Sequence, residues 1–164
     1  DPRTFQWTIS GNNGIGFLVL EGLRADQTSF RSYFVDSGKG LKMDWAASTA
    51  WSEVPVAGIL PALDERIVML RCTLDKQPHF DSSVDEKRSW FVLRLSDPGE
   101  PLWGFAPTGS PLESALLELF NFGDMIFERK ENQRAVVRIR KGEAGWKANR
   151  VEIVELLAND WVLP

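Results

Sequence analysis

Residues 110–123, SPLESALLELFNFG, decide the fold because they carry the clearest helix signals in the chain. Ser110 suits the N-cap, Pro111 the first helical position and Glu113 the third, where it completes a capping box. Apolar residues then recur at the spacing of one helix face: Leu112, Ala115, Leu116, Leu119 and Phe120. We therefore predict one long helix over 111–122, whose apolar stripe contributes several kcal/mol at roughly 25 cal/mol per Å² buried.

Gly123 is suited to end this helix in a left-handed cap, and strand patterns lie on both sides of it. Segments that alternate, or that are short and apolar, occur at residues 67–74, 90–95, 102–106, 134–140 and 151–156. Three strands, one helix and two strands form the order of a small Greek-key barrel of OB type. The apolar side changes between Ile153 and Val154, which predicts a β-bulge that helps the sheet to curve.

The N-terminal part of the sequence predicts a four-stranded β-meander. Turn sequences such as Asn13-Gly14 separate strand-like segments at 5–9, 17–24, 30–35 and 41–45. The alternation of Phe5, Trp7 and Ile9 is typical of a half-buried strand. Core packing is the interpretation that we favour for three tryptophans on alternating strand positions, namely Trp7, Trp45 and Trp90.

The fold class that follows is α+β and mainly antiparallel β: a meander plus a five-stranded OB-like barrel. We divide the chain into a meander at 1–45, a connector at 46–64 and a barrel at 65–164. In the connector, residues 46–48 are expected to form a loop. Ser52 is expected to cap a short helix with Pro55 in its first turn, and Pro61 to end that helix. Trp161 and Val162 are expected to add a last short strand pairing.

Composition limits the class of protein. The 164 residues are 43% hydrophobic and 26% charged, which indicates a globular chain and excludes disorder of the whole. The net charge of −4 argues against a protein built mainly to neutralise phosphates. The sequence begins Asp1-Pro2, which we interpret either as a tag remnant or as a domain separated from a signal or anchor segment.

The search for catalytic and metal-binding patterns assigns no catalytic, cofactor-binding or metal-binding residue, and no cofactor. His79 lies in a loop at 75–88 with four carboxylates, and this set fits a calcium site in residue type. The loop lacks the EF-hand order, so we favour a solvated acidic loop (the carboxylates are Asp75, Asp81, Asp85 and Glu86). Cys72 lies on the apolar side of its strand, which is typical of a small buried hydrophobe.

Basic and aromatic residues give two interpretations of the barrel's last strands. Arginines and lysines near tryptophans suit single-stranded nucleic acid, because bases stack on aromatic rings. We favour the alternative, an outer sheet face on which arginines pair across strands with Glu152 and Glu155. A candidate partner or ligand surface nevertheless comprises Trp51, Trp103, Trp146, Arg138, Arg140 and Arg150.

Parts of the sequence also resemble known folds and families. Residues 19–45 resemble the closing strands of an NTF2-like (SnoaL-like) fold through Phe30–Val35 and Leu41–Trp45, although those folds place helices before the meander. Residues 66–157 resemble an OB-like barrel in element order. The whole sequence is similar to uncharacterised bacterial cell-envelope proteins through four short segments, which are Met43–Trp45, Trp51–Glu53, Leu102–Phe105 and Asp160–Val162. The last resemblance implies an exported or membrane-anchored protein without an assigned reaction.

We therefore favour a non-catalytic binding or scaffold module, part of a larger envelope-associated protein, with a protein as partner. One alternative is a single-stranded nucleic-acid-binding OB-like domain, against which the acidic charge argues. Another is a small-ligand binder or enzyme that uses carboxylates at Asp44 or in the 75–88 loop. The expected location is extracytoplasmic or membrane-anchored, with membrane contact only through a preceding anchor.

Overall fold

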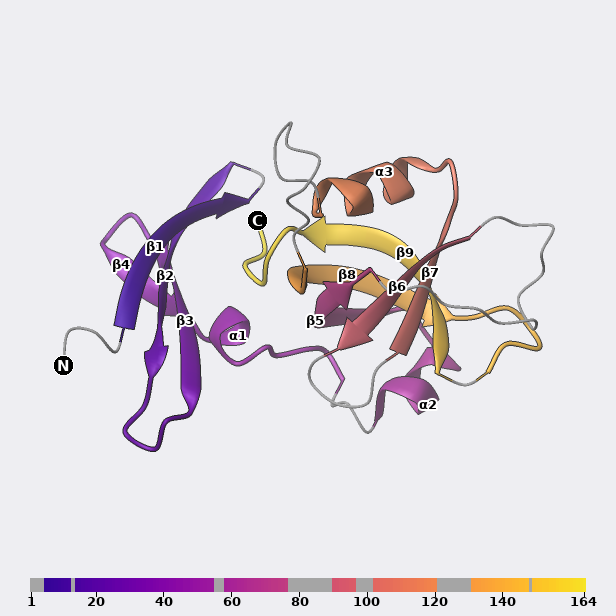
Figure 1. Cartoon of the computed structure of the whole chain (residues 1–164), viewed down its shortest axis with the longest axis horizontal. Helices are drawn as coiled ribbons and strands as arrows, with labels where there is room; N and C mark the ends of the chain where they lie inside the picture. The colour runs from indigo at the N-terminus through magenta and orange to yellow at the C-terminus, as the bar shows by residue number, and fades with distance from the viewer. Residues whose placement is uncertain are drawn as a thin grey trace.

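The computed structural model describes residues 5–12, 14–54, 58–76, 90–96, 102–120, 131–147 and 149–164. They form a four-stranded open sheet and a closed five-stranded barrel, which lie side by side in Figure 1. The predicted α+β, mainly antiparallel architecture is confirmed. Among these residues no helix has the length and apolar character that crossing a membrane requires.

The open sheet is an antiparallel meander in chain order. It consists of β1 (Phe5–Asn12), β2 (Ile15–Leu23), β3 (Ser29–Asp36) and β4 (Leu41–Asp44). Asn12 pairs with Ile15, so β1 and β2 are separated by two residues, the spacing that the Asn-Gly sequence predicts. The fourth strand ends one residue earlier than expected, because the side chain of Asp44 accepts a hydrogen bond from the Ala47 amide and caps a helical turn.

That turn, α1 (Trp45–Ser48), corrects the loop expected at residues 46–48. The connector's second helix, α2 (Ile59–Leu63), starts at a Gly58 cap and contains Pro61 instead of ending there. Pro61 is tolerated because the first turn of a helix needs no internal hydrogen bond from its amides. Ser52 does not cap this helix, since its hydroxyl accepts a hydrogen bond from the Arg71 amide.

The barrel is closed in the order β5-β6-β7-β9-β8. Its elements are β5 (Val68–Asp75), β6 (Trp90–Ser96), β7 (Leu102–Pro107), α3 (Pro111–Glu118), β8 (Gln133–Lys141) and β9 (Arg150–Ala158). All neighbouring pairs are antiparallel except β7 and β9, which run parallel. The predicted bulge is present, because β9 residues on either side of Val154 pair with successive residues of β8.

Closure buries one side of every barrel strand whose side chains are described. On β8, Ala135, Val137 and Ile139 are fully buried. Gly104 lies where β7 passes closest to its neighbours, since a Cβ there would come within 2.4 Å of Leu95 Cδ1 and 2.7 Å of Ile153 Cδ1. The interior is therefore packed too closely at this position for any side chain.

Helices cover the barrel from two sides, α3 against β7 and β9 and α2 against β5 and β8 (Figure 1). Helix α3 begins at the predicted residue, with the Ser110 side chain accepting from the Glu113 amide and Leu116 fully buried. The capping box is incomplete, because Glu113 Oε2 accepts from the Gly109 amide instead of the Ser110 amide. It ends at Glu118, and a turn at Leu119–Phe120 completes its apolar side. The remainder of the predicted 111–122 span, with Gly123, lies outside the described residues.

The last six residues, 159–164, run between sheet and barrel, and we name them the clasp (Figure 1). They do not form the strand pairing expected at Trp161 and Val162. Instead, Val162 is buried in a second, smaller core with Phe17, Val19, Tyr33 and Ala47. On the inner side of the open sheet, α1 and the clasp thus cover the residues of β2 and β3.

Candidate functional site

The outer side of the open sheet is its most unusual surface. Strand register places the apolar residues in rows that cross the strands. One row contains Ile9, Leu18, Phe34 and Met43, a second Trp7, Leu20 and Ser32, and a third Phe5, Gly22 and Phe30. We name this surface the open face; it also includes Leu41, two residues before Met43 on β4.

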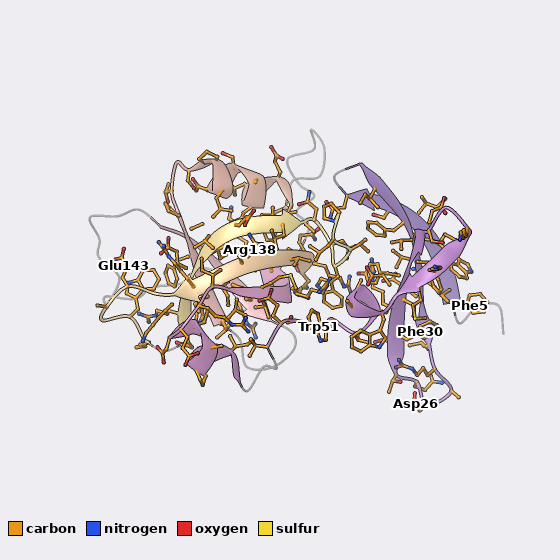
Figure 2. The ribbon with its side chains drawn as sticks, turned by 180° about the vertical axis from the view of Figure 1, so that it is seen from behind. Phe5, Asp26, Phe30, Trp51, Arg138 and Glu143 are labelled. Carbon is orange, nitrogen blue, oxygen red and sulfur yellow. The ribbon has the colours of Figure 1, made fainter. Side chains whose placement is uncertain are left out.

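The open face is exposed to solvent. Phe5, Trp7, Ile9, Leu41 and Met43 leave between 49% and 83% of their surface uncovered, while the residues between them on β2 and β3 are half-buried. The rings of Trp7 and Phe34 lie 5.8 Å apart, so Trp7 reaches across β2 on this side of the sheet. Trp45, which directly follows β4, is 61% exposed. Figure 2 shows Phe5 and Phe30 at the end of the molecule away from the barrel.

Polar groups border the open face at the turn between β2 and β3. The Arg24 guanidinium lies 5.8 Å from the centre of the Phe30 ring and donates to Thr28 Oγ1. Asp26 accepts from the Thr28 hydroxyl at 2.6 Å and from its amide at 3.0 Å, and these bonds lower the pKa of Asp26. The arrangement of an apolar centre and a polar border is typical of protein interfaces.

The expectation that Trp7 and Trp45 pack in the core is therefore wrong, and Phe5, Trp7 and Ile9 are exposed on the outer side of β1. The half-buried strand expected there is wrong too, because Gln6 and Thr8 on the other side of β1 are also exposed. Alternation shows only that one side of a strand is apolar, not that this side is buried. Both sides of the open sheet are apolar, but α1 and the clasp cover only one of them. The signal in the sequence that indicates the open face is that consecutive residues are apolar at 17–20 and 33–35. These two strands therefore carry apolar side chains on both of their faces. The side chain of Trp90 lies outside the described residues.

A second candidate surface is the barrel cleft, which has a volume of about 700 Å³ and lies between α2 and the loop joining β8 to β9. Trp146, Lys147 and Arg150 line it together with Lys141, Asp64 and Glu143. The Trp146 ring packs 4.6 Å from the ring of Phe105, and Lys141 forms an ion pair with Asp64. Burial lowers the pKa of Arg150, which nevertheless remains a cation.

The six residues of the sequence-derived surface fall into separate groups. Trp146 and Arg150 line the barrel cleft, and Trp103 is the strand neighbour of Arg150. Arg138 pairs with Glu155 at 2.7 Å, and Arg140 makes two hydrogen bonds to Glu152 at 2.7 and 2.9 Å. The favoured interpretation of these two arginines, pairing across strands, is confirmed. Trp51 lies between sheet and barrel in Figure 2, apart from the rest.

The clasp joins the two halves through partly buried polar contacts. Asp160 Oδ1 accepts from the Tyr33 hydroxyl at 2.5 Å, and Asp160 Oδ2 lies 3.3 Å from Arg31 Nη2. Arg31 also pairs with Glu21. Burial, followed by the nearby carboxylate of Asp160, raises the pKa of Tyr33 well above its usual value of about 10. Asp160 has φ +115°, a conformation that surrounding contacts must hold in place.

On the barrel side, Arg71 fixes the clasp to the connector. Its Nε donates to the Trp161 carbonyl at 2.8 Å, and its Nη1 donates to the Trp51 carbonyl at 2.6 Å. Trp161 Nε1 donates to the Cys72 carbonyl, and Arg134 lies over the Trp161 ring. Burial lowers the pKa of Arg71, and the Asp44 carboxylate opposes this effect. These contacts are structural in kind, since they satisfy buried polar groups.

The structure bears on some of the catalytic and metal-binding alternatives. Cys72 is buried in the barrel core, and the Asp44 carboxylate is engaged as a helix cap. Within the described ranges, no group of three or more His, Cys, Asp or Glu side chains is placed to hold a metal ion. His79 and loop residues 77–88 lie outside those ranges, so the acidic-loop interpretation stays a prediction.

A polar cleft of about 510 Å³ lies where the sheet, the barrel and the clasp meet. Its charged lining residues are Arg31, Arg134, Glu118, Glu131 and Asp160. Its charges are of both signs, and Arg31 is already paired with Asp160. The cleft is therefore a weaker candidate than the open face.

Comparison with family models, with curated proteins and with solved structures finds no match for this chain.

Proposed function

We propose that this chain is a non-catalytic binding or scaffold module and that the open face is its binding surface. The observation that supports this is the row Ile9, Leu18, Phe34 and Met43, which is apolar across all four strands and exposed at both of its ends. Water-exposed apolar patches larger than a few hundred Å² are rare on monomers and mark interaction sites. A protein partner suits this chemistry because the face offers apolar area and aromatic side chains.

Site-specific photocrosslinking tests this proposal. A photoreactive phenylalanine analogue at position 5 or 7, in cells that produce the protein, is expected to give a discrete protein adduct. The matched control is the analogue at Ile67, which is equally exposed but lies next to the barrel strand β5. Adducts at Ile67 but none at Phe5 and Trp7 would contradict the proposed role. Turnover of a substrate by the purified protein, abolished by a single side-chain change, would contradict it as well.

Association with the cell envelope is a separate part of the proposal, and it rests on sequence resemblance alone. Fractionation of cells that express the tagged natural gene product is expected to place it in the envelope fraction. Recovery in the cytosolic fraction only would remove this part and leave the binding role intact.

A second candidate function is single-stranded nucleic-acid binding by the barrel cleft. Supporting it are the strand order, which fits an OB-like barrel, and the aromatic and basic side chains on the β8–β9 loop. The acidic lining residues Asp64 and Glu143, and the net charge of −4, make it the weaker candidate.

Fluorescence anisotropy with a labelled oligonucleotide at low salt tests the second candidate. Binding that falls steeply with salt and is weakened by Lys147→Glu, but not by Lys39→Glu in the open sheet, is expected. Absence of binding up to roughly 50 μM, in the weak non-specific range, would exclude it.

A further inference from the structure

We propose that the open face is the interface of a homodimer in which two copies of this chain stack their open sheets face to face. This inference rests on the binding role proposed above and names its partner. Three properties of the open face support it: its area, its lack of charge and its shape.

The uncovered area suits a dimer. Phe5, Trp7, Ile9, Leu41 and Met43 each leave about half or more of their surface exposed. At on the order of 100 Å² apiece, they offer roughly 500 Å² per copy. A standard protein interface takes about 800 Å² from each partner, and the half-buried residues of β2 and β3 supply the difference.

The face carries no charge in its three central rows, where every position is apolar, serine or glycine. A two-fold interface brings the same surface together twice, so any charge near its centre would meet its own copy. The charged residues of the central sheet rows, such as Glu21 and Arg31, lie on the inner side, where they pair with each other. Arg24, Asp26 and Asp36 are left at the border.

The shape and layering of the sheet favour the same partner. A sheet with two apolar sides needs a covering layer on each, and the described residues supply only one, the layer formed by α1 and the clasp. Two sheets of similar twist pack face to face about 10 Å apart and within about 30° of each other. A second copy has the same twist because it has the same sequence, whereas a charged polymer or an acidic peptide would find no partner group in these rows.

Sedimentation analysis of the full chain tests the proposal over roughly 1–100 μM, a range that brackets micromolar affinities. The wild-type protein is expected to approach twice its 18.5 kDa mass as concentration rises. Ile9→Glu and Met43→Glu are expected to remain monomeric, because each places a carboxylate in the interface. Ile67→Glu, the matched control beside the barrel, is expected to dimerise like the wild type.

Thiol crosslinking gives a second measurement that does not depend on charged variants. Cys72 is the only cysteine and is buried, so a cysteine introduced at Ile9 or Met43 is the main accessible thiol. A short bifunctional maleimide is expected to join two chains at these positions and not in Ile67→Cys.

A wild-type protein that stays monomeric throughout the range overturns the dimer, and so does a dimer that persists in both face variants. The photocrosslinking result separates this failure from that of the proposed function. Adducts of Phe5 or Trp7 with a different protein would retain the binding role and reject self-association. Adducts at neither position would reject both.

Discussion

The barrel and the open sheet contain strands of the same alternating type, but they bury them very differently. On β8 of the barrel the apolar side is fully covered, whereas on β1 of the sheet the apolar side faces water. Closure accounts for the difference, because a barrel surrounds its own interior and a four-stranded sheet needs other elements on both sides. A strand pattern therefore reports which residues share a side and not whether that side is covered.

The largest expected effect is in the barrel. Leu116→Asp places a carboxylate in a fully buried site, so we expect a loss of at least about 3 kcal/mol in the free energy of unfolding. Urea denaturation followed by circular dichroism measures it. Ser114→Asp on the exposed side of the same helix is the control and should change little. Equal midpoints for the two variants would mean that α3 does not cover the barrel.

Two strand glycines compare the regions directly. Gly104→Ala in the barrel should cost about 1–3 kcal/mol, because its Cβ would overlap Leu95 and Ile153. Gly16→Ala in the open sheet should be close to neutral, since no atom lies within 4 Å of the added Cβ. Thermal unfolding of both variants measures the difference, and a Gly104 variant as stable as the wild type would indicate a loosely packed barrel.

The clasp predicts a stability loss at high pH. The pKa of Tyr33 is raised on folding, so its stabilising effect is complete below its unfolded pKa of about 10 and is lost as pH rises above that value. Tyr33 is the only tyrosine, so the rise in tyrosinate absorbance at 295 nm in the folded protein reports its ionisation. Tyr33→Phe should flatten the stability profile above pH 10, at the cost of the hydrogen bond to Asp160.

Asp160→Asn should lower the pKa of Tyr33 only in part, because burial is the larger cause. Asp26→Asn, at the exposed turn of the sheet, is the control and should leave the absorbance titration unchanged. A tyrosine that ionises at its usual pH in the folded wild type would show that the clasp does not cover it.

Cross-strand ion pairs compare the regions more finely. Double-mutant cycles should give less than about 1 kcal/mol for Arg138 with Glu155, since both side chains are about half exposed. Arg31 with Glu21 should give more, because Arg31 is less exposed and also contacts Asp160. Equal coupling energies would mean that the ion pair at the junction between sheet and barrel is as accessible to solvent as the pair on the outer surface.

The smallest effect is expected on the open face itself. At concentrations low enough to keep the protein monomeric, Ile9→Thr should change the unfolding free energy by no more than about 0.5 kcal/mol. At high concentration the variant should have a lower apparent unfolding free energy than the wild type, because association adds to apparent stability. Denaturation at two concentrations separates these cases, and a large loss at low concentration would place Ile9 inside the monomer's core.

Local signals predicted much of the fold. Ser110 and Pro111 fixed the start of α3, and the change of side at Val154 predicted the bulge. What failed depended on contacts distant in sequence. Asp44 caps a helix that the neighbouring residues do not predict. The alternation at Trp7 predicts an apolar side of the strand but carries no information on whether that side is covered. The open face was therefore not among the predicted site residues.

The position of the clasp has a consequence for how the protein is made. Tyr33 leaves the ribosome 127 residues before its partner Asp160, a delay of roughly 6–25 s at usual translation speeds. Until then only α1 covers the inner side of the first sheet, and the open face is uncovered. The nascent chain thus passes through an interval in which its earliest strands are prone to aggregate, and a chaperone that shields residues 5–44 would raise the yield of folded protein.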